Sequence, residues 1–360
     1  MQKNIYSVIR GTGSYIPENI VSNKDFIKSD FYNSDGSIID TPKEELIRKF
    51  KKITNISERR YIDNNHVTSD IAFFAADNCL KSSGIDPETL DYIILAHNFG
   101  DVSYGDSRTD MVPSLSARLK HKLKIQNPKT VCYDVIFGCP GWLQSVIQAN
   151  YYIKSGDAKR VLVVGAEALS RISDPHDRDS MIYSDGAGAV ILEGMESDTP
   201  VGFLSHSARS DTFEHAYLLW MNKTYNPTLK SEALYLKMNG RKLYEYALNT
   251  VPLVVKESIE KANLTLDDIK KVLIHQANEK MDEAIIQRIF SLYNKPRVSE
   301  GIMPMIIEKL GNSSVATIPI LLDLILKDKL ESHSLNQGDN IVFASVGAGT
   351  NINAVTYRMA

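Results

Sequence analysis

The sequence contains few cysteines and none of the arrangements in which cysteines usually bind metal or pair in disulfides. Its three cysteines, Cys79, Cys132 and Cys139, are widely separated among 360 residues. An odd number at such spacing argues against a disulfide framework, and the chain has neither a Cys-x-x-Cys pair nor a clustered set of histidines and cysteines. We therefore expect a protein of a reducing compartment without a bound metal.

The chain also lacks a strong excess of charge and any long hydrophobic run. Lysine and arginine total 41 against 44 aspartates and glutamates, a net charge of −3, so no nucleic-acid role is expected. No apolar run approaches the roughly 18 residues of a membrane span, and Met1 to Asn4 do not resemble the start of a signal peptide. We expect a cytoplasmic protein that binds no nucleic acid and does not insert into a membrane.

The most informative stretch places Cys139 between a predicted strand and a predicted helix. Residues 130–137 are apolar and rich in strand formers, whereas 143–153 have helical spacing and lead to Gly156. Pro140 suits the first helical position, and the free amides and dipole of that turn should favour a thiolate. Cys139 is therefore a candidate nucleophile, although a buried structural cysteine would give the same local pattern.

Strand and helix patterns alternate along the whole chain, which predicts an α/β architecture. We expect strands at 5–10, 91–97, 160–165, 184–190, 271–274, 341–346 and 351–358, and helices at 41–52, 69–83, 114–123, 242–262, 279–292 and 315–330. Residues 23–62 are polar and indicate an insertion or flap. The irregular segment 196–235 marks a boundary between halves 1–195 and 196–360, whose shared rhythm suggests one duplicated unit.

A glycine pair near the N-terminus does not make a nucleotide site. Gly11 and Gly13 follow the first predicted strand, and we expect the chain to turn there. The third glycine of a dinucleotide fingerprint is replaced by Ile16, and Pro17 disrupts the expected helix start. The small residues of 184–190 similarly indicate close packing of a strand, because no lysine or helix start accompanies them.

Three further candidate residues or loops lie at the ends of predicted elements. His275 follows the strand 271–274, Asn312 lies in a glycine-serine turn before a helix, and residues 347–349 form a tight loop between strands. Each has an ordinary structural explanation when taken alone, as a satisfied polar side chain or as turn chemistry.

Together these segments closely resemble the β-ketoacyl-ACP synthase III family of the thiolase superfamily. The resemblance rests on Phe137-Gly138-Cys139-Pro140-Gly141, His275-Gln276-Ala277-Asn278, Gly311-Asn312-Ser313-Ser314 and Gly347-Ala348-Gly349, with further matches at 11–17, 56–60, 163–167 and 184–189. It runs from about residue 5 to the end. It implies a duplicated five-layer α/β/α/β/α fold, a homodimer, and an acyltransferase that needs no cofactor beyond its thioester substrates.

The resemblance also implies a role for each matched residue. Cys139 takes an acyl group from a thioester, here acyl-CoA or an acyl carrier protein. His275, as neutral imidazole, and Asn312 donate hydrogen bonds to the thioester carbonyl of malonyl-ACP as carbon dioxide leaves. The backbone amides of Cys139 and Ala348 hold the oxyanion formed when the resulting carbanion attacks the acyl group, and the reaction begins fatty-acid synthesis.

Three further residues match positions that bind the acyl chain or the carrier. Val112 matches the residue that gates acyl-pocket depth, in a loop that reaches across the dimer. Lys280 and Arg288 lie on the helix after His275, where the family docks acyl carrier protein. Both also fit ordinary solvated helix charges.

The chain departs from the family where a CoA primer is commonly bound. The region matching 43–60 contains no tryptophan, because the two tryptophans are Trp142 and Trp220. The absence of this tryptophan leaves a second function open. The chain could be a specialised condensing enzyme of lipid, pigment or quinolone-like biosynthesis, which joins acyl-carrier thioesters. For chemistry without decarboxylation, candidate general bases are Asp101, Asp106 and Asp110.

Two other classes of function are weaker. Cysteine, histidine and asparagine in this order also occur in cysteine proteases, but the local protease signature around the cysteine is absent. A catalytically inactive partner subunit would be expected to have lost Cys139, His275 or Asn312. Cys132 and His97 are expected to be core residues.

Overall fold

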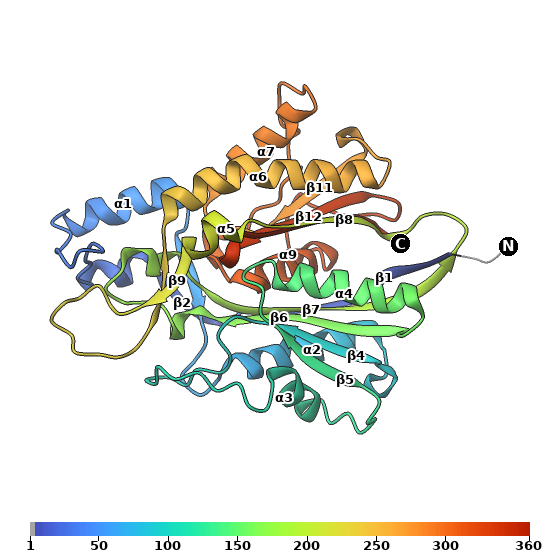
Figure 1. The fold of residues 1–360 in the computed structure, drawn as a ribbon, viewed down its shortest axis with the longest axis horizontal. Helices are drawn as coiled ribbons and strands as arrows, with labels where there is room; N and C mark the ends of the chain where they lie inside the picture. The colour runs from blue at the N-terminus through green and yellow to red at the C-terminus, as the bar shows by residue number, and fades with distance from the viewer. Residues whose placement is uncertain (1–3) are drawn as a thin grey trace.

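The computed structural model describes residues 4–360, and these residues form five layers (Figure 1). Helices α2 and α3 cover the outside of one sheet, and helices α6 and α7 cover the outside of another. Helices α4 and α9 lie between the two sheets. This arrangement confirms the predicted five-layer α/β/α/β/α architecture.

The first sheet has the strand order β1-β7-β6-β4-β5. Its elements are β1 (Asn4–Tyr15), α2 (Thr68–Ser83), β4 (Tyr92–Ala96), α3 (Leu115–Lys122), β5 (Val131–Val135), α4 (Gly141–Ser155), β6 (Arg160–Ala168) and β7 (Asp185–Ser197). Strands β5, β4 and β6 run parallel, whereas β7 is antiparallel to both β6 and β1. The parallel strands therefore end at one edge, where β4 and β5 lead into the loops containing Asn98 and Cys139.

The second sheet has the strand order β11-β12-β13-β8. Its elements are β8 (Gly202–Ser210), α6 (Gly240–Lys261), β11 (Ile269–Ile274), α7 (Glu279–Leu292), α9 (Thr317–Leu326), β12 (Asn340–Gly347) and β13 (Asn351–Arg358). Strands β11 and β12 are parallel, and β13 is antiparallel to both of its neighbours. Strand by strand, β8, β13, β12 and β11 repeat the arrangement of β1, β7, β6 and β4.

The helices repeat in the same order. Each half runs from an edge strand through an outer helix, α2 or α6, to a strand and a second outer helix, α3 or α7. The inner helix, α4 or α9, and two final strands follow. The second sheet contains no counterpart of β5 among the described residues. Where a strand equivalent to β5 would pair with β11, the chain makes one backbone hydrogen bond, from Val272 N to Ile302 O at 2.8 Å.

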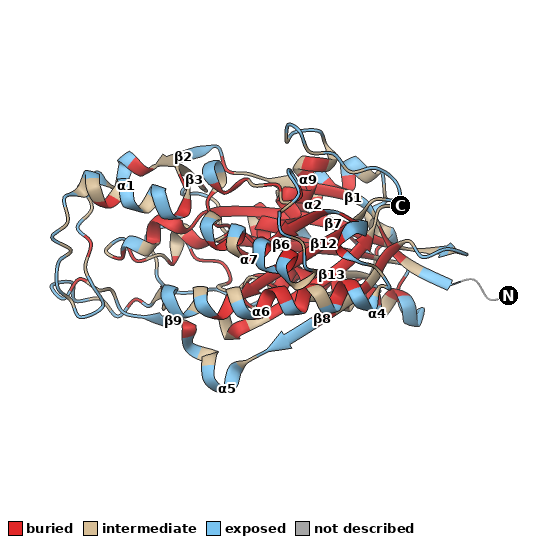
Figure 2. Ribbon diagram, turned by 90° about the horizontal axis from the view of Figure 1, so that it is seen from above, coloured by how far each residue is buried: buried red, intermediate tan, exposed pale blue. Residues whose placement is uncertain are grey.

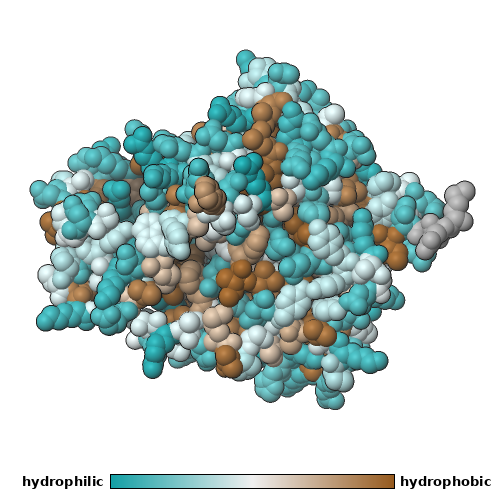
Figure 3. All heavy atoms as spheres, viewed as in Figure 1, coloured by the Kyte–Doolittle hydropathy of each residue, from teal (hydrophilic) through white to brown (hydrophobic). Residues whose placement is uncertain are grey.

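A large cluster of buried hydrophobic residues lies around α4 and α9, and Figure 2 shows how much of the centre of the molecule is buried. The ring of Trp142, at the start of α4, is 1% exposed and packs edge-on against Phe343 of β12, with ring centroids 6.0 Å apart. Gly165 and Gly188 permit this closeness, because a Cβ at Gly165 would lie 2.5 Å from Val315 O and one at Gly188 2.7 Å from Pro319 Cβ. By contrast, the face in Figure 3 is mostly hydrophilic, with small groups of apolar residues.

The predicted turn at Gly11 and Gly13 is wrong. Strand β1 continues through both glycines to Tyr15, with an irregularity in register between Ile9 and Gly11. A Cβ at Gly13 would lie 2.3 Å from the backbone nitrogen of Cys79. These glycines therefore allow α2 to lie directly on the strand, and they do not serve a turn.

The segment predicted to be a flap is built into the molecule. It contains β2 (Asn19–Ser22), α1 (Lys43–Thr54) and β3 (Glu58–Tyr61), and β2 pairs with β3. Arg59 is fully buried, and its guanidinium donates to Met181 O at 2.6 Å and to Asn23 Oδ1 at 2.7 Å. Burial lowers the pKa of Arg59 to about 10.

The segment predicted to be irregular also contains regular structure. Besides β8, it includes α5 (Thr212–His215) and β9 (Leu219–Asn222), which pairs with β10 (Tyr235–Met238) as a hairpin. Lys237 of β10 is buried and forms ion pairs with Asp174 at 2.5 Å and Asp177 at 3.2 Å. These pairs hold the hairpin against the loop that precedes β7. A short helix, α8 (Ile307–Leu310), leads to Asn312.

Of the two residues expected in the core, only one is fully buried. His97 is 0% exposed, as predicted. Cys132 is half-buried, because its strand β5 lies at the edge of the sheet with no strand on its outer side in the described chain. No helix within residues 4–360 is long and apolar enough to cross a membrane.

Candidate active site

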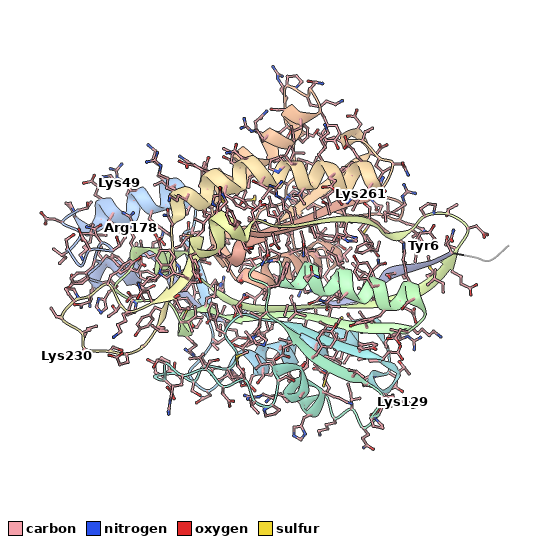
Figure 4. All side chains as sticks on the ribbon, in the orientation of Figure 1. Tyr6, Lys49, Lys129, Arg178, Lys230 and Lys261 are labelled. Atoms are coloured by element: carbon pink, nitrogen blue, oxygen red, sulfur yellow. The ribbon has the colours of Figure 1, made fainter. Side chains whose placement is uncertain are left out.

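A cavity of about 1240 Å³ contains all three predicted catalytic side chains in its lining. Cys139, His275 and Asn312 reach it from three different loops, and Ala348 reaches it from a fourth. The rest of the wall includes α1, the segment before β7, the β9–β10 hairpin and the start of α6. Lys49 of α1 and Arg178 both line it, at the end of the molecule where α1 lies (Figure 4).

Cys139 lies on a sharp turn between β5 and α4, as the sequence predicts. Gly138 makes the turn with φ of +67°, and a Cβ there would lie 2.6 Å from Ala348 N. A Cβ at Gly347 would lie 2.4 Å from Cys139 N. A side chain at Gly138 or at Gly347 would collide with the other segment. Because both residues are glycines, the two segments that carry the backbone amides of Cys139 and Ala348 are in direct contact.

The thiol of Cys139 is not the stabilised thiolate that its helix position predicts. Burial raises the pKa of Cys139 to about 11, and the negative charge of Glu167 adds to this effect. A hydrogen bond from Ser314 acts in the opposite direction, with Oγ 3.4 Å from Sγ. Desolvation is thus the largest influence on the pKa of this thiol in the free protein, and it favours the protonated form.

His275 follows β11 directly, and a hydrogen bond from its backbone amide fixes its position. Its amide donates to Ala344 O of β12 at 2.8 Å. Burial lowers the pKa of the imidazole to about 4, which keeps the ring neutral at physiological pH as predicted. Within residues 4–360 its Nδ1 is buried without a hydrogen-bond partner.

Asn312 is fixed by a short backbone bridge to the segment before β7. Its amide donates to Ile182 O at 2.9 Å, and its carbonyl accepts from Ser184 N at 2.8 Å. The side-chain Oδ1 accepts from Ser314 N at 2.8 Å. This bond orients the carboxamide, so that its Nδ2 is the group left to donate into the cavity.

Ser314 lies where the three predicted catalytic residues meet. Its amide bonds Asn312, its hydroxyl bonds Cys139, and its backbone interacts with the imidazole of His275. Its φ of +53° is unusual for a residue other than glycine. Such a strained backbone persists where surrounding contacts determine it, and it often occurs at functional sites.

The predicted pocket and docking residues lie outside this cavity. Val112 is 86% exposed and is not among the cavity-lining residues of the described chain. Lys280 and Arg288 are exposed on α7, and Arg288 donates to Asn249 Oδ1 at 3.1 Å. Lys280 lies next to Met281, which does line the cavity.

The three aspartates considered as general bases are committed to arginines. Arg118 donates to Asp101 and to Asp110, each at 2.7 Å, and Arg108 pairs with Asp106 at 3.0 Å. The hydrogen bond from Arg108 lowers the pKa of Asp106 to about 2. None of the three aspartates is among the cavity-lining residues in the described chain, so a general base at these positions stays a prediction.

The structure also shows cavity residues that sequence reasoning missed. Trp220 lines the cavity from β9, and Phe50 and Ile53 line it from α1. Asn98 lines it after β4, next to the buried carboxylate of Glu167. The single carboxylate at the end of an otherwise apolar strand was a signal that could have identified Glu167.

Comparisons with known proteins agree with this geometry. The family described as 3-oxoacyl-[acyl-carrier-protein] synthase III matches residues 133–212, and its C-terminal part matches 259–359. Beta-ketoacyl-[acyl-carrier-protein] synthase III of Staphylococcus aureus strain JH1 is 32% identical over 353 residues, covering 97% of this chain and 98% of that protein.

Solved structures are similar over the same extent. The 3-oxoacyl-[acyl-carrier-protein] synthase III of Aquifex aeolicus has a TM-score of 0.79 at 29% identity, covering 98% of this chain and 99% of its own. The synthase III of Pseudomonas aeruginosa PAO1 has a TM-score of 0.80 at 24% identity, with 98% of both chains covered, and supports the fold alone.

Proposed function

The chain belongs to the 3-oxoacyl-[acyl-carrier-protein] synthase III family of condensing enzymes, and we propose that Cys139, His275 and Asn312 are its catalytic residues. It is an acyltransferase that forms a carbon–carbon bond at the start of fatty-acid synthesis. The observation that carries the assignment is the single cavity in which the thiol, the neutral imidazole and the carboxamide meet.

The first half-reaction transfers an acyl group to Cys139. The sulfur attacks the thioester carbonyl, the carbonyl oxygen becomes an oxyanion, and the donor thiol leaves with the proton from Cys139. The amides of Cys139 and Ala348 stabilise that oxyanion, since their segments are in direct contact. Because the resting group is a thiol, proton removal has to accompany attack.

The second half-reaction uses the other two side chains. Malonyl-ACP loses carbon dioxide, and the resulting enolate oxygen accepts hydrogen bonds from His275 and from Asn312 Nδ2. A neutral imidazole can donate there, and a low pKa keeps it neutral. The enolate carbon attacks acyl-Cys139, and the sulfur leaves as the new carbon–carbon bond forms.

We further propose a homodimer in the cytoplasm that binds acyl carrier protein through Lys280 and Arg288. Edge strand β5 supports the dimer, because Val131 is 49% exposed and the adjoining Ile136 is 58% exposed. Val112 would then contribute to the partner's acyl pocket. The proposed reaction uses thioester substrates alone and requires no cofactor.

The donor of the acyl group can be identified by intact-protein mass spectrometry. The protein is mixed separately with acetyl-CoA, with longer acyl-CoAs and with matching acyl carrier proteins, and malonyl-ACP is then added. We expect one acyl increment that disappears when malonyl-ACP is added, with release of a 3-oxoacyl product. An unlabelled protein would contradict the nucleophile assignment.

The same experiment tests the alternative of a specialised condensing enzyme. Labelling by long acyl-carrier thioesters alone would support that alternative, whereas labelling by acetyl-CoA supports fatty-acid initiation. The Staphylococcus aureus relative favours fatty-acid initiation.

A further inference from the structure

A chain of partly buried hydrogen bonds leads from the first sheet to the sulfur of Cys139. Glu167, at the end of β6, accepts from Asn98 twice, from the backbone N at 3.1 Å and from Nδ2 at 2.7 Å. Asn98 Nδ2 also donates to Ser314 Oγ at 3.4 Å, and Ser314 Oγ lies 3.4 Å from Cys139 Sγ. The four side chains come from four separate segments of the chain.

The direction of these hydrogen bonds follows from donor and acceptor chemistry. Ionised Glu167 can only accept, so it selects the NH₂ group of Asn98 and fixes which way the carboxamide points. That NH₂ group can only donate, so Ser314 Oγ must accept from it. The single proton of the Ser314 hydroxyl is then left to point at the sulfur.

We propose that Glu167 and Asn98 are positioning residues that hold Ser314 as a hydrogen-bond donor to the sulfur of Cys139. This inference rests on the proposed role of Cys139 as the nucleophile. A sulfur that develops negative charge, as the proton leaves or as acyl-Cys139 breaks down, gains a donor already in place. The thiol of the resting protein gains less, because it carries less charge.

The burial of Glu167 and Ser314 limits the other hydrogen-bond partners that are available to them. Glu167 is 0% exposed, and Ser314 is 5% exposed. Water does not readily reach Glu167, so an altered group at this position must find another partner within the chain. The backbone of Ser314 cannot follow, because Asn312 Oδ1 holds its amide.

The charge of Glu167 cannot explain its presence by attraction. Burial raises the pKa of Glu167 to about 7, whereas His97 and Asn98 lower it and Asp185 raises it further. The negative charge of Glu167 raises the pKa of Cys139. Its electrostatic effect on the sulfur therefore opposes its effect through the hydrogen-bond chain, and this opposition makes the proposal testable.

The test is the pH dependence of Cys139 alkylation by iodoacetamide, which reacts with the thiolate. The titratable groups around the sulfur are Glu167 from β6, His275 from the loop after β11, and Tyr183 from the segment before β7. Mass spectrometry of the labelled peptide measures the rate at each pH. The assay needs no acyl substrate, so its result is independent of which thioester the enzyme uses.

The decisive variant is Glu167→Gln, which keeps the shape and removes the charge. Its NH₂ group can donate to Asn98 Oδ1 once the Asn98 carboxamide turns over, which places an oxygen rather than a donor against Ser314. The serine proton is then drawn away from the sulfur. We expect the alkylation midpoint to rise by about one pH unit, the size of a hydrogen bond to a charged group.

The opposite result would overturn the proposal. If charge alone mattered, Glu167→Gln would lower the midpoint, and an unchanged midpoint would show that the hydrogen-bond chain has no effect on the sulfur. Ser314→Ala should raise the midpoint at least as much as Glu167→Gln. Asn98→Leu, which removes the donor without changing a charge, should also raise it and serves if Glu167→Gln does not fold.

Ser313→Ala is the matched control. Ser313 lies beside Ser314, but its hydroxyl bonds Thr317 at 3.3 Å and not the sulfur. This variant should keep the wild-type midpoint, and circular dichroism should confirm the fold of every variant. A midpoint that moves equally in Ser313→Ala would show a general loosening of the loop and not a specific bond.

Discussion

Two histidines occupy corresponding places in the two halves of the molecule and have opposite environments. His97 follows β4, and His275 follows the corresponding strand β11. His97 uses both ring nitrogens inside the protein, with Nε2 3.0 Å from Asp134 Oδ2 and Nδ1 accepting from Gly100 N at 3.1 Å. His275 leaves Nδ1 without a partner within the described chain and faces the cavity.

The inner helices show the same division of roles. The loop before α4 carries the proposed nucleophile Cys139, whereas the loop before α9 carries Asn312 and Ser314. Each loop contains a left-handed glycine, Gly138 with φ of +67° and Gly311 with φ of +58°. In the proposed mechanism, a duplicated scaffold thus supplies the acyl acceptor from one half and the hydrogen-bond donors for the extender from the other.

The largest difference between the roles of the two halves should appear when Cys139→Ala is compared with Asn312→Ala. We expect Cys139→Ala to abolish acyl-enzyme formation, because its side chain is the acceptor. Asn312→Ala should still become acylated but should condense slowly. Intact-mass labelling and product formation distinguish the two. Labelling of Cys139→Ala at another cysteine would contradict the assignment.

The two histidines can be separated in the same way. His275→Ala should reduce the condensation rate by about 10²–10³, the usual loss for one oxyanion donor. His97→Ala should instead reduce the free energy of unfolding by about 3 kcal/mol, because Asp134 loses its buried partner. Steady-state kinetics and urea denaturation of both variants test this. Equal kinetic losses in variants of equal stability would refute the distinction.

Stability should depend on pH through His275 in a defined direction. Its folded pKa of about 4 lies below the ordinary value of 6.5, so the unfolded chain binds more protons between these values. The stability of the wild type relative to His275→Gln should therefore fall by about 2 kcal/mol from pH 7 to pH 5. Urea denaturation at both pH values measures it.

Glu167 supplies a check on the sign of this effect. Its pKa is raised to about 7, so its contribution grows as pH falls and opposes that of His275. Because Glu167 is present in both proteins, its effect cancels in the difference. A difference that increases toward pH 5 would contradict the neutral buried imidazole.

The smallest expected effect concerns the outer helix of the second half. Lys280→Glu on α7 should raise the KM for malonyl-ACP about threefold, as expected for one exposed charge. Lys129→Glu, an exposed lysine of the first half before β5 (Figure 4), is the control and should leave KM unchanged. Equal effects would indicate general charge repulsion of the acidic partner.

The sequence predicted most elements and the three residues that meet in the cavity. The turn at Cys139, the strand before His275 and the helix at 279–292 are local features, and local patterns identify them. The α7 prediction agrees at both ends, whereas the helix expected at 315–330 is shorter, because α9 ends at Leu326.

The rest depends on contacts between distant segments. Gly13 suggested a turn by composition, but its role is set by Cys79 of α2. Trp220 appeared to lie in irregular structure, and only the hairpin against the segment before β7 brings it to the cavity. The sequence predicted a thiolate at Cys139, whereas burial raises the pKa of this thiol. Burial is not visible in a local sequence pattern.

The position of α4 and α9 between the two sheets has a consequence for the dynamics of the enzyme. Helix α9 and the first part of α4 are mostly buried, so we expect their amides to exchange with deuterium more slowly than those of exposed segments. The β9–β10 hairpin, at the edge of the cavity, can open locally and should exchange sooner. We therefore expect the loops that carry Cys139 and Asn312 to adjoin a slowly exchanging part of the chain, while the hairpin at the edge of the cavity exchanges faster.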